Sequence, residues 1–139
     1  MLDVVVVGGG FAGMYALYRL RREGWNVKVL EAGTDVGGTW YWNRYPGARC
    51  DVPSLEYSFG FSPELEQEWD WPEVFSAQTD ILEYANHIAD RFDLRSDMQF
   101  NCRVNAVTFD EAANTWTLTS EASDTFESRY VIMATGCLS

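Results

Sequence analysis

Hydrophobic and polar positions in the first thirty residues alternate in the way expected of a strand, a helix and a second strand. Leu2–Val7 is a short, largely β-branched run that ends at glycine, which is typical of a strand buried on both faces. Apolar residues at helical spacing predict a helix over Phe11–Glu23, and Gly24 is well placed to end it. Asn26–Leu30 alternates as a second strand, so the three segments predict a strand–helix–strand unit with a parallel crossover.

The remaining residues divide into an irregular stretch, a further helix and a group of strands. Residues 32–77 are rich in Gly, Pro and Trp with little periodicity, and so long an irregular stretch in a compact domain is usually functional. One apolar face predicts a helix over Thr79–Phe92. Partial alternation predicts a hairpin around the loop at Glu111–Asn114, a weaker strand near Thr125–Ser128, and another buried strand at Tyr130–Ala134.

This order of elements predicts a doubly wound, Rossmann-like α/β fold in a single domain that covers residues 1–139. Strands at 2–7, 26–30 and 129–134 are expected to be parallel, with the last lying beside the first. The strands within 103–128 are expected to form an antiparallel flap, a β-meander, on that sheet. The closing strand would then bring Gly136 close to the loop that follows the first strand.

Composition narrows the classes of partner. The formal charge of −11 argues against nucleic acid, whose phosphates require a basic surface. No apolar run approaches the roughly 20 residues of a membrane span, and no basic leader precedes an apolar segment, so neither a membrane segment nor a signal peptide is expected. Three widely spaced cysteines fit reduced thiols in the cytoplasm better than disulfides or a metal site. The six Trp suggest a large planar ligand or a buried partner surface, with simple core packing as an equally open alternative.

The loop after the first strand carries the pattern Gly8-x-Gly10-x-x-Gly13. Gly8 permits a tight turn out of the strand, Gly10 lets the backbone approach a pyrophosphate, and Gly13 lets the helix pack on the strand. The pyrophosphate would then meet unpaired backbone N–H groups at a helix N-terminus. Gly9 has no function that the pattern assigns.

Glu31 ends the second predicted strand, about 20 residues beyond the glycine loop, where an acidic residue binds ribose hydroxyls in dinucleotide sites. The alternative is a solvated charge at a strand end. Because a carboxylate there would repel a 2′-phosphate, the loop should hold FAD or NAD and not NADP. The loop itself does not distinguish FAD from NAD.

Residues 37–51 carry a second and more specific motif, G-G-x-W-x-x-x-x-Y-P-G-x-x-x-D. With this motif the chain resembles the type I Baeyer–Villiger monooxygenases, flavoproteins of the phenylacetone and cyclohexanone monooxygenase kind. The resemblance extends over the whole chain. It includes the closing Ala134-Thr135-Gly136, which is similar to the second FAD-contacting motif of flavoproteins with two dinucleotide-binding domains.

The resemblance implies that the prosthetic group is FAD and distributes its contacts along the chain. The pyrophosphate would be surrounded by Gly8, Gly10, Phe11, Ala12 and Gly13, and the ribose would contact Glu31. The side of the cofactor toward the flavin would contact Thr39, Trp40 and Trp42, and the isoalloxazine with its ribityl chain would lie near Cys50, Asp51 and Tyr57. The adenine would contact the backbone of Val104, and the closing motif would contribute Gly136. Asp51 would be the catalytic residue that positions an active-site arginine and the nicotinamide. Without the resemblance, an Asx turn after Pro46-Gly47 would be the preferred interpretation of Asp51.

Several family features are not found in these 139 residues. They are a second glycine-rich loop for NADPH, the fingerprint F-x-G-x-x-x-H-x-x-x-W-P and the catalytic arginine. Arg44 and Arg49 are interpreted as loop residues, His87 as solvated, and Trp69-Asp70-Trp71-Pro72 as packing. The chain is therefore expected to be the leading FAD-binding portion of a longer enzyme, with the NADPH domain elsewhere, and to give no turnover alone.

The activity implied by the resemblance is oxygen insertion beside a ketone carbonyl, with NADPH and O₂, to give an ester or lactone. A related flavin monooxygenase that oxidises N or S centres is the second possibility, and the spacing from Trp40 to Asp51 argues against it. A non-catalytic module that binds a nucleotide or a partner through its aromatic residues is the third.

Overall fold

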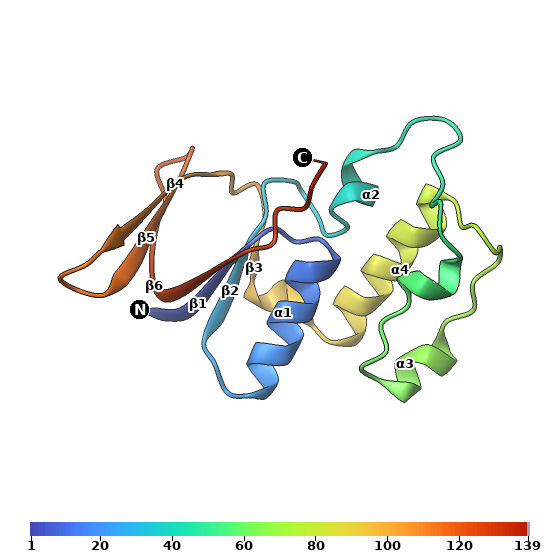
Figure 1. Ribbon diagram of the computed structural model, residues 1–139, viewed down its shortest axis with the longest axis horizontal. Helices are drawn as coiled ribbons and strands as arrows, with labels where there is room; N and C mark the ends of the chain where they lie inside the picture. The colour runs from blue at the N-terminus through green and yellow to red at the C-terminus, as the bar shows by residue number, and fades with distance from the viewer. Residues whose placement is uncertain (139) are drawn as a thin grey trace.

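The structure, a computed structural model, describes residues 1–138 and contains one six-stranded sheet with helices packed on it (Figure 1). The strands follow the order β3-β2-β1-β6-β5-β4 across the sheet. Their bounds are β1 Leu2–Val7, β2 Val27–Leu30, β3 Met98–Gln99, β4 Val104–Asp110, β5 Thr115–Ser120 and β6 Thr125–Met133. Parallel pairing joins β3, β2, β1 and β6, and antiparallel pairing joins β6, β5 and β4. The predicted doubly wound α/β class, with its last strand beside the first, is confirmed.

The two long helices begin and end within one residue of the predicted positions. Their bounds, with those of the shorter helices, are α1 Phe11–Arg22, α2 Thr39–Trp42, α3 Pro63–Glu68 and α4 Gln78–Arg91, and the 3-10 turns are η1 Ser54–Tyr57 and η2 Leu94–Asp97. The stretch 32–77, predicted to be irregular, contains α2, η1 and α3. None of these exceeds six residues, which is too short for an apolar period to reveal.

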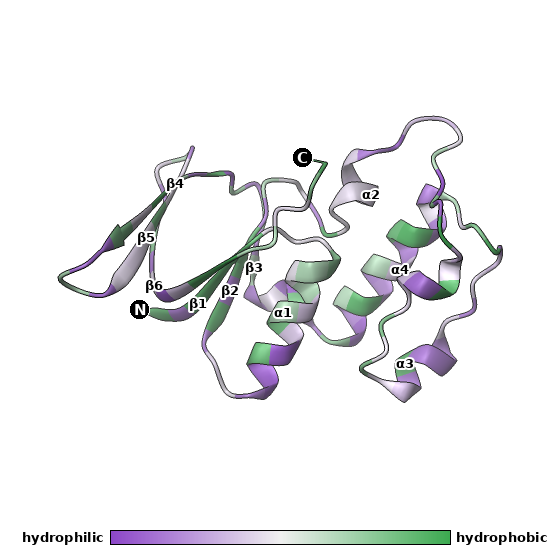
Figure 2. Ribbon diagram, viewed as in Figure 1, coloured by the Kyte–Doolittle hydropathy of each residue, from purple (hydrophilic) through white to green (hydrophobic). Residues whose placement is uncertain are grey.

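Two hydrophobic clusters cover the two faces of the sheet. Val4 and Val6 of β1 point toward α1, where they pack with Met14 and Leu17, and this cluster continues to Tyr84 of α4. On the other face, Val5 packs with Leu30, Cys102 and Leu118 beneath the antiparallel strands. Figure 2 shows the hydrophobic colour along β1 and on parts of α1 and α4. Because the strand alternates between two covered faces, β1 is apolar throughout, as its sequence predicted.

The meander differs from the prediction in its connection to the sheet. The segments predicted as separate strands, Thr125–Ser128 and Tyr130–Ala134, form one strand, β6. Ser128 pairs with Trp116 of β5 on one side and with Leu2 of β1 on the other. The antiparallel strands therefore continue the parallel sheet beyond β6, and Leu118 of β5 packs with Val5 on one face of that sheet, as expected of the predicted flap.

The prediction that Tyr130–Ala134 is buried is wrong. Tyr130, Ile132 and Met133 are 51%, 38% and 58% exposed. Tyr130 and Ile132 pair with Val4 and Val6, so they lie on the helix-covered face of the sheet, yet α1 packs mainly over β1 and β2. No helix within residues 1–138 covers β6, and an apolar strand without a covering layer stays exposed whatever its sequence.

The predictions for Trp69 and Trp71 are confirmed, and the prediction for His87 is not. Packing is confirmed for Trp69 and Trp71, whose rings lie 5.2 and 4.9 Å from that of Tyr84. His87, predicted to be solvated, is instead partly buried, with its ring 5.4 Å from that of Trp69 and its Nε2 3.4 Å from a Glu68 carboxylate oxygen. It lies at the edge of the apolar face of α4, where the indole of Trp69 covers it.

Within residues 1–138, none of the helices combines the length and apolar composition needed to cross a lipid bilayer. In the same part of the chain, no three His, Cys, Asp or Glu side chains gather as a metal site would require. The three cysteines are all free thiols, with Cys50 and Cys102 buried and Cys137 exposed.

Candidate functional site

The glycine loop joins the end of β1 to the start of α1 and touches the end of β6. Gly8 has a φ of +115°, and a Cβ there would lie 2.2 Å from the carbonyl oxygen of Ala134. The Ala134 N–H donates to the Val7 carbonyl over 2.8 Å, which fixes this approach. The turn predicted at Gly8 therefore exists, and it requires glycine both for its backbone angle and for its contact with the chain after β6.

Gly13 and Gly10 allow two further close approaches between backbone segments. A Cβ at Gly13 would lie 1.8 Å from the carbonyl oxygen of Gly8, so only glycine lets α1 start this close to the end of β1. A Cβ at Gly38 would lie 2.9 Å from the Cα of Gly10. Gly38, from the second motif, thus packs directly on the first, which explains why two glycine motifs occur in one short chain.

The N-terminus of α1 is open to an anion. Gly10 is the N-cap residue, it offers no side chain to cap the helix, and the first turn contains no acidic residue. The early N–H groups of a helix lack intrahelical partners, and the helix dipole places partial positive charge there. This arrangement suits a phosphate group.

Glu31 lies buried beside this loop, with only 5% of its surface exposed. Its Oε1 accepts a hydrogen bond from the Gly9 N–H at 2.8 Å, and its Oε2 accepts one from the Gly33 N–H at 2.5 Å. The alternative of a solvated strand-end charge is therefore wrong. Each carboxylate oxygen keeps a further lone pair, so Glu31 can still accept hydrogen bonds from two adjacent hydroxyl groups of a ribose.

Sequence reasoning missed the role of Gly9 and Gly33 as donors to Glu31. A Cβ at Gly9 would lie 3.2 Å from the Cβ and Cγ of Glu31, which leaves a substituted residue little room. Backbone donors carry no signature in the side-chain sequence. The available signal was a third consecutive glycine in the loop and a glycine two residues after the acidic residue.

An aromatic cluster lies on the other side of the glycine loop. Trp40 of α2 and Cys50 are buried together with Ile81 of α4, and Phe11 and Tyr57 pack against them. The ring centroid of Tyr57 lies 5.9 Å from those of both Phe11 and Trp40. Burial raises the pKa of the Tyr57 hydroxyl; an interaction with Trp40 opposes this rise, and nearby Cys50 and Asp51 reinforce it. Tyr57 is thus a neutral, partly buried phenol at neutral pH.

Asp51 follows Cys50 and is exposed. Within residues 1–138 no protein group donates a hydrogen bond to its carboxylate, so the Asx turn that we considered for it is absent. Its proximity to Tyr57 places a negative charge next to the aromatic cluster, where it is free to pair with a cation that these residues do not supply. Neither Arg44 nor Arg49 fills that role: Arg44 donates to the Tyr41 carbonyl, and Arg49 pairs with Glu73.

The structure brings most of the predicted contact residues together but leaves others apart. Trp42 is half exposed and contacts the ring of Tyr41, outside the buried cluster. Val104 starts β4, two residues beyond Cys102, whose N–H donates to the Glu31 carbonyl at 2.9 Å. Thr39 begins α2, directly after Gly38, and Gly136 follows the end of β6 with a φ of +72°. Their contacts with a cofactor stay predictions.

Comparisons with known proteins agree with this geometry. Residues 6–70 match the family model of the NAD(P)-binding Rossmann-like domain. The chain is 40% identical to a Baeyer–Villiger monooxygenase of Pseudooceanicola batsensis, with 99% of this chain and 25% of that protein covered. It is 41% identical to the acetone monooxygenase (methyl acetate-forming) of Gordonia sp. strain TY-5 and also to the phenazine N-monooxygenase of Lysobacter antibioticus, with 99% of this chain and 26% of each relative covered.

Solved structures give the same result. The steroid monooxygenase described as oxidised and bound to NADP superposes with a TM-score of 0.97 at 53% identity, over 99% of this chain and 26% of that one. OTEMO, described in complex with FAD and NADP, superposes with a TM-score of 0.94 at 42% identity, again over 99% of this chain and 26% of that one.

The matched region covers nearly all of this chain, whereas the chain spans about a quarter of the length of the curated relatives. The structure places Gly38 and Trp40, two residues of the motif on which the sequence resemblance was based, against Gly10 of the glycine loop and in the buried cluster with Cys50. Over nearly all of its length the chain is therefore similar to part of the Baeyer–Villiger monooxygenases.

Proposed function

We propose that these residues form the FAD-binding part of an NADPH- and O₂-dependent monooxygenase that inserts oxygen beside a ketone carbonyl. The observation that carries the proposal is buried Glu31, held by the N–H groups of Gly9 and Gly33 next to the uncapped start of α1. That arrangement has the chemistry of an adenosine diphosphate site. The acetone monooxygenase among the relatives is described as forming methyl acetate, an ester, and the OTEMO structure contains FAD and NADP.

The residues present fit FAD at both of its ends. The N–H groups at the start of α1 would bind the diphosphate, and Glu31 would accept the ribose hydroxyls. The aromatic cluster of Trp40 and Tyr57 would form a flat, apolar wall for the isoalloxazine and keep water from it. Once bound, FAD supplies the redox and oxygen chemistry.

Asp51 would act beside the flavin ring, where the substrate reacts. Its exposed carboxylate, free of protein donors within residues 1–138, would hold a cationic arginine from another part of the polypeptide beside the ring. Since Glu31 would repel a 2′-phosphate, NADPH would bind to other residues of a longer protein. We therefore expect the 139 residues by themselves to give no turnover. Free thiols at all three cysteines support a cytoplasmic location.

A second function, oxygenation at nitrogen, is supported by one observation. The phenazine N-monooxygenase is as similar to this chain as the acetone monooxygenase is, at 41% identity over 138 residues. This similarity weakens the inference drawn from the spacing between Trp40 and Asp51, because that spacing lies within the region that both relatives share. Ketone and phenazine oxidation by the longer protein, measured side by side, would decide between the two reactions.

Titration of the purified chain with FAD tests the proposal. We expect saturable binding with quenched flavin fluorescence, competition by ADP, and no competition by NADP at equal concentration. A non-catalytic module that binds through its aromatic residues would take up neither FAD nor ADP at the glycine loop. Absence of saturable FAD binding, or equal competition by NADP, would contradict the proposed cofactor.

A further inference from the structure

Two segments of the irregular region lie antiparallel next to the aromatic cluster. The Gln78 N–H donates to the Ala48 carbonyl at 2.9 Å, the Cys50 N–H to the Ser76 carbonyl at 3.1 Å, and the Ser54 N–H to the Val74 carbonyl at 2.6 Å. These backbone bonds join residues 48–54 to residues 74–78 on both sides of Asp51. The loop that presents Asp51 is therefore held at its two ends.

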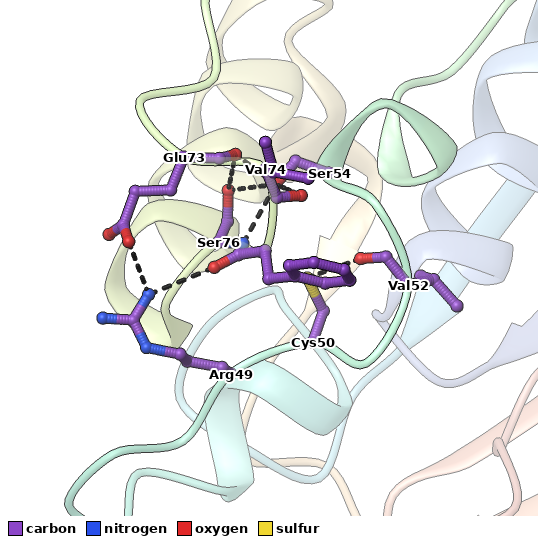
Figure 3. A network of polar contacts seen from close by, with 8 residues as sticks. Arg49, Cys50, Val52, Ser54, Glu73, Val74 and Ser76 are labelled. Carbon is purple, nitrogen blue, oxygen red and sulfur yellow. Dashed lines mark hydrogen bonds and ion pairs between the residues drawn. The ribbon is translucent and has the colours of Figure 1, made fainter.

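Two serine hydroxyls lie buried between these segments, as Figure 3 shows. Ser54 is 2% exposed and Ser76 is fully buried. Their Oγ atoms lie 2.5 Å apart, and the Ser76 N–H donates to the Ser54 Oγ at 3.0 Å. The Ser54 Oγ also lies 2.8 Å from the Glu73 carbonyl oxygen and 2.9 Å from that of Val74. We call Ser54 and Ser76 the serine pair.

The contacts of the serine pair allow an assignment of hydrogen atoms that uses the Ser54 hydroxyl fully, although either hydroxyl can donate to the other and the Ser76 Oγ also lies 3.5 Å from the Glu73 carbonyl oxygen. A hydroxyl has one proton to donate and two lone pairs. The Ser54 hydroxyl donates to a carbonyl of residue 73 or 74, and its oxygen accepts from both the N–H and the hydroxyl of Ser76. Every hydrogen-bonding capacity of the Ser54 hydroxyl is then used in a buried place, so alanine at this position would leave the Ser76 N–H without its acceptor.

The serine pair lies directly behind the side chains that face the proposed flavin. Cys50, whose thiol donates to the Val52 carbonyl at 3.1 Å, shares a buried cluster with Trp40 and Ile81. Two residues after Ser76, buried Gln78 donates from its Nε2 to the Trp40 carbonyl at 2.6 Å. Residues 74–78 thus bind the segment that contains Asp51 through the serine pair and the backbone, and bind the Trp40 carbonyl through Gln78.

The exposed ion pair between these two segments is weaker than the buried serine pair. Arg49 donates to a Glu73 carboxylate oxygen at 2.8 Å, but both side chains are about half exposed. Exposed ion pairs contribute little, because water and salt screen them. The position of the segments is therefore set by the buried serine pair and not by this ion pair.

We propose that Ser54 and Ser76 are positioning residues that fix Asp51 and Trp40 at the flavin end of the site. The inference rests on the proposed function, since it supposes that FAD is the ligand. It assigns no contact with FAD to either serine. The pair acts through the loop, so its removal should affect the flavin half of FAD and not the ADP half, which the glycine loop and Glu31 hold.

Binding of FAD and of ADP to Ser54→Ala in the full 139-residue chain tests this inference. We expect the FAD dissociation constant to rise about tenfold, the effect of losing one buried hydrogen-bond partner, while the ADP dissociation constant changes by less than about twofold. Ser76→Ala, which keeps the N–H bond to Ser54, should give a smaller change in the same direction and serves if Ser54→Ala does not fold. The quenching of bound flavin should decrease in both variants.

Ser62→Ala is the matched control. Ser62 is also a buried serine whose hydroxyl accepts a backbone N–H, that of Leu65 at 3.2 Å, but it caps α3, away from α2 in Figure 1. Its loss should lower stability and leave both dissociation constants unchanged. Equal weakening of FAD and ADP by Ser54→Ala, or an unchanged FAD dissociation constant, would overturn the inference. If the unaltered chain bound neither ligand, the proposed function itself would fail.

Discussion

Glu31 shows how one side chain can serve the fold and the ligand together. Its two oxygens accept the N–H groups of Gly9 and Gly33, so it connects the loop after β1 to the loop after β2. Hydrogen bonds to a charged acceptor are about twice as strong as neutral ones, and burial removes competition from water. The carboxylate is therefore fixed in place before any ribose binds.

Glu31→Gln tests this dual role at the scale of a single residue. A Gln side chain offers one oxygen and one NH₂ group, so either the Gly9 or the Gly33 N–H loses its acceptor. We expect unfolding free energy to fall by about 1–3 kcal/mol, and FAD affinity to fall about tenfold or more. Denaturant unfolding and FAD titration measure the two effects.

Glu23→Gln is the control for this substitution, because Glu23 is exposed and only pairs with Arg19 on the surface of α1. It should change unfolding free energy by less than about 1 kcal/mol and leave FAD affinity unaltered. Unchanged FAD affinity in Glu31→Gln would contradict the assigned role of Glu31.

Among residues, sequence spacing predicted those whose side chains, or lack of them, the local backbone requires. Gly8, Gly13 and Glu31 were predicted because a turn, a close approach and an acidic partner each demand one residue type. Gln78 was not predicted, because its hydrogen bond to the Trp40 carbonyl joins segments 38 positions apart, and no local pattern encodes such a contact.

At the scale of elements, length decided which predictions were correct. α1 and α4 span 12 and 14 residues, enough for three or more turns of apolar periodicity. β3 has two residues and α2 has four, so neither carries a period to detect. These short elements exist because their neighbours hold them: β3 pairs with β2, and α2 is anchored by Gly37 and Gly38.

The exposed side of β6 gives a prediction at the same scale. Val6 and Ile132 are paired neighbours in the sheet, but Val6 is buried and Ile132 is 38% exposed. Val6→Thr places a hydroxyl without a partner in the core and should cost about 2 kcal/mol. Ile132→Thr lets the hydroxyl reach water and should cost about 1 kcal/mol or less.

Urea unfolding of the two variants checks this comparison, because both substitutions introduce Thr into a strand and keep β-branching. An equal loss of stability in the two variants would mean that β6 is as well covered as β1. In that case the exposed surface described for Tyr130, Ile132 and Met133 would be wrong.

At the scale of the whole molecule, topology was the most predictable property and surface cover the least. The order β2-β1-β6 follows from right-handed crossovers between parallel strands, and the sequence predicted it. Burial of Tyr130–Ala134 was predicted wrongly because an apolar run shows what a strand can bury and not what is present to cover it. The formal charge of −11 argues against a nucleic-acid partner but contributes nothing to the prediction of the fold.

The central claim is that the loop after β1, Glu31 and the Trp40–Cys50–Tyr57 cluster together form one FAD site. The most direct test is an NMR titration of the isotope-labelled chain with FAD, following every backbone amide. The account predicts the largest shifts at residues 8–13, at Glu31 and around Trp40 and Asp51, with little change at the turn of the β4–β5 hairpin, residues 111–114. Shifts confined to other surfaces, or none at saturating FAD, would contradict it.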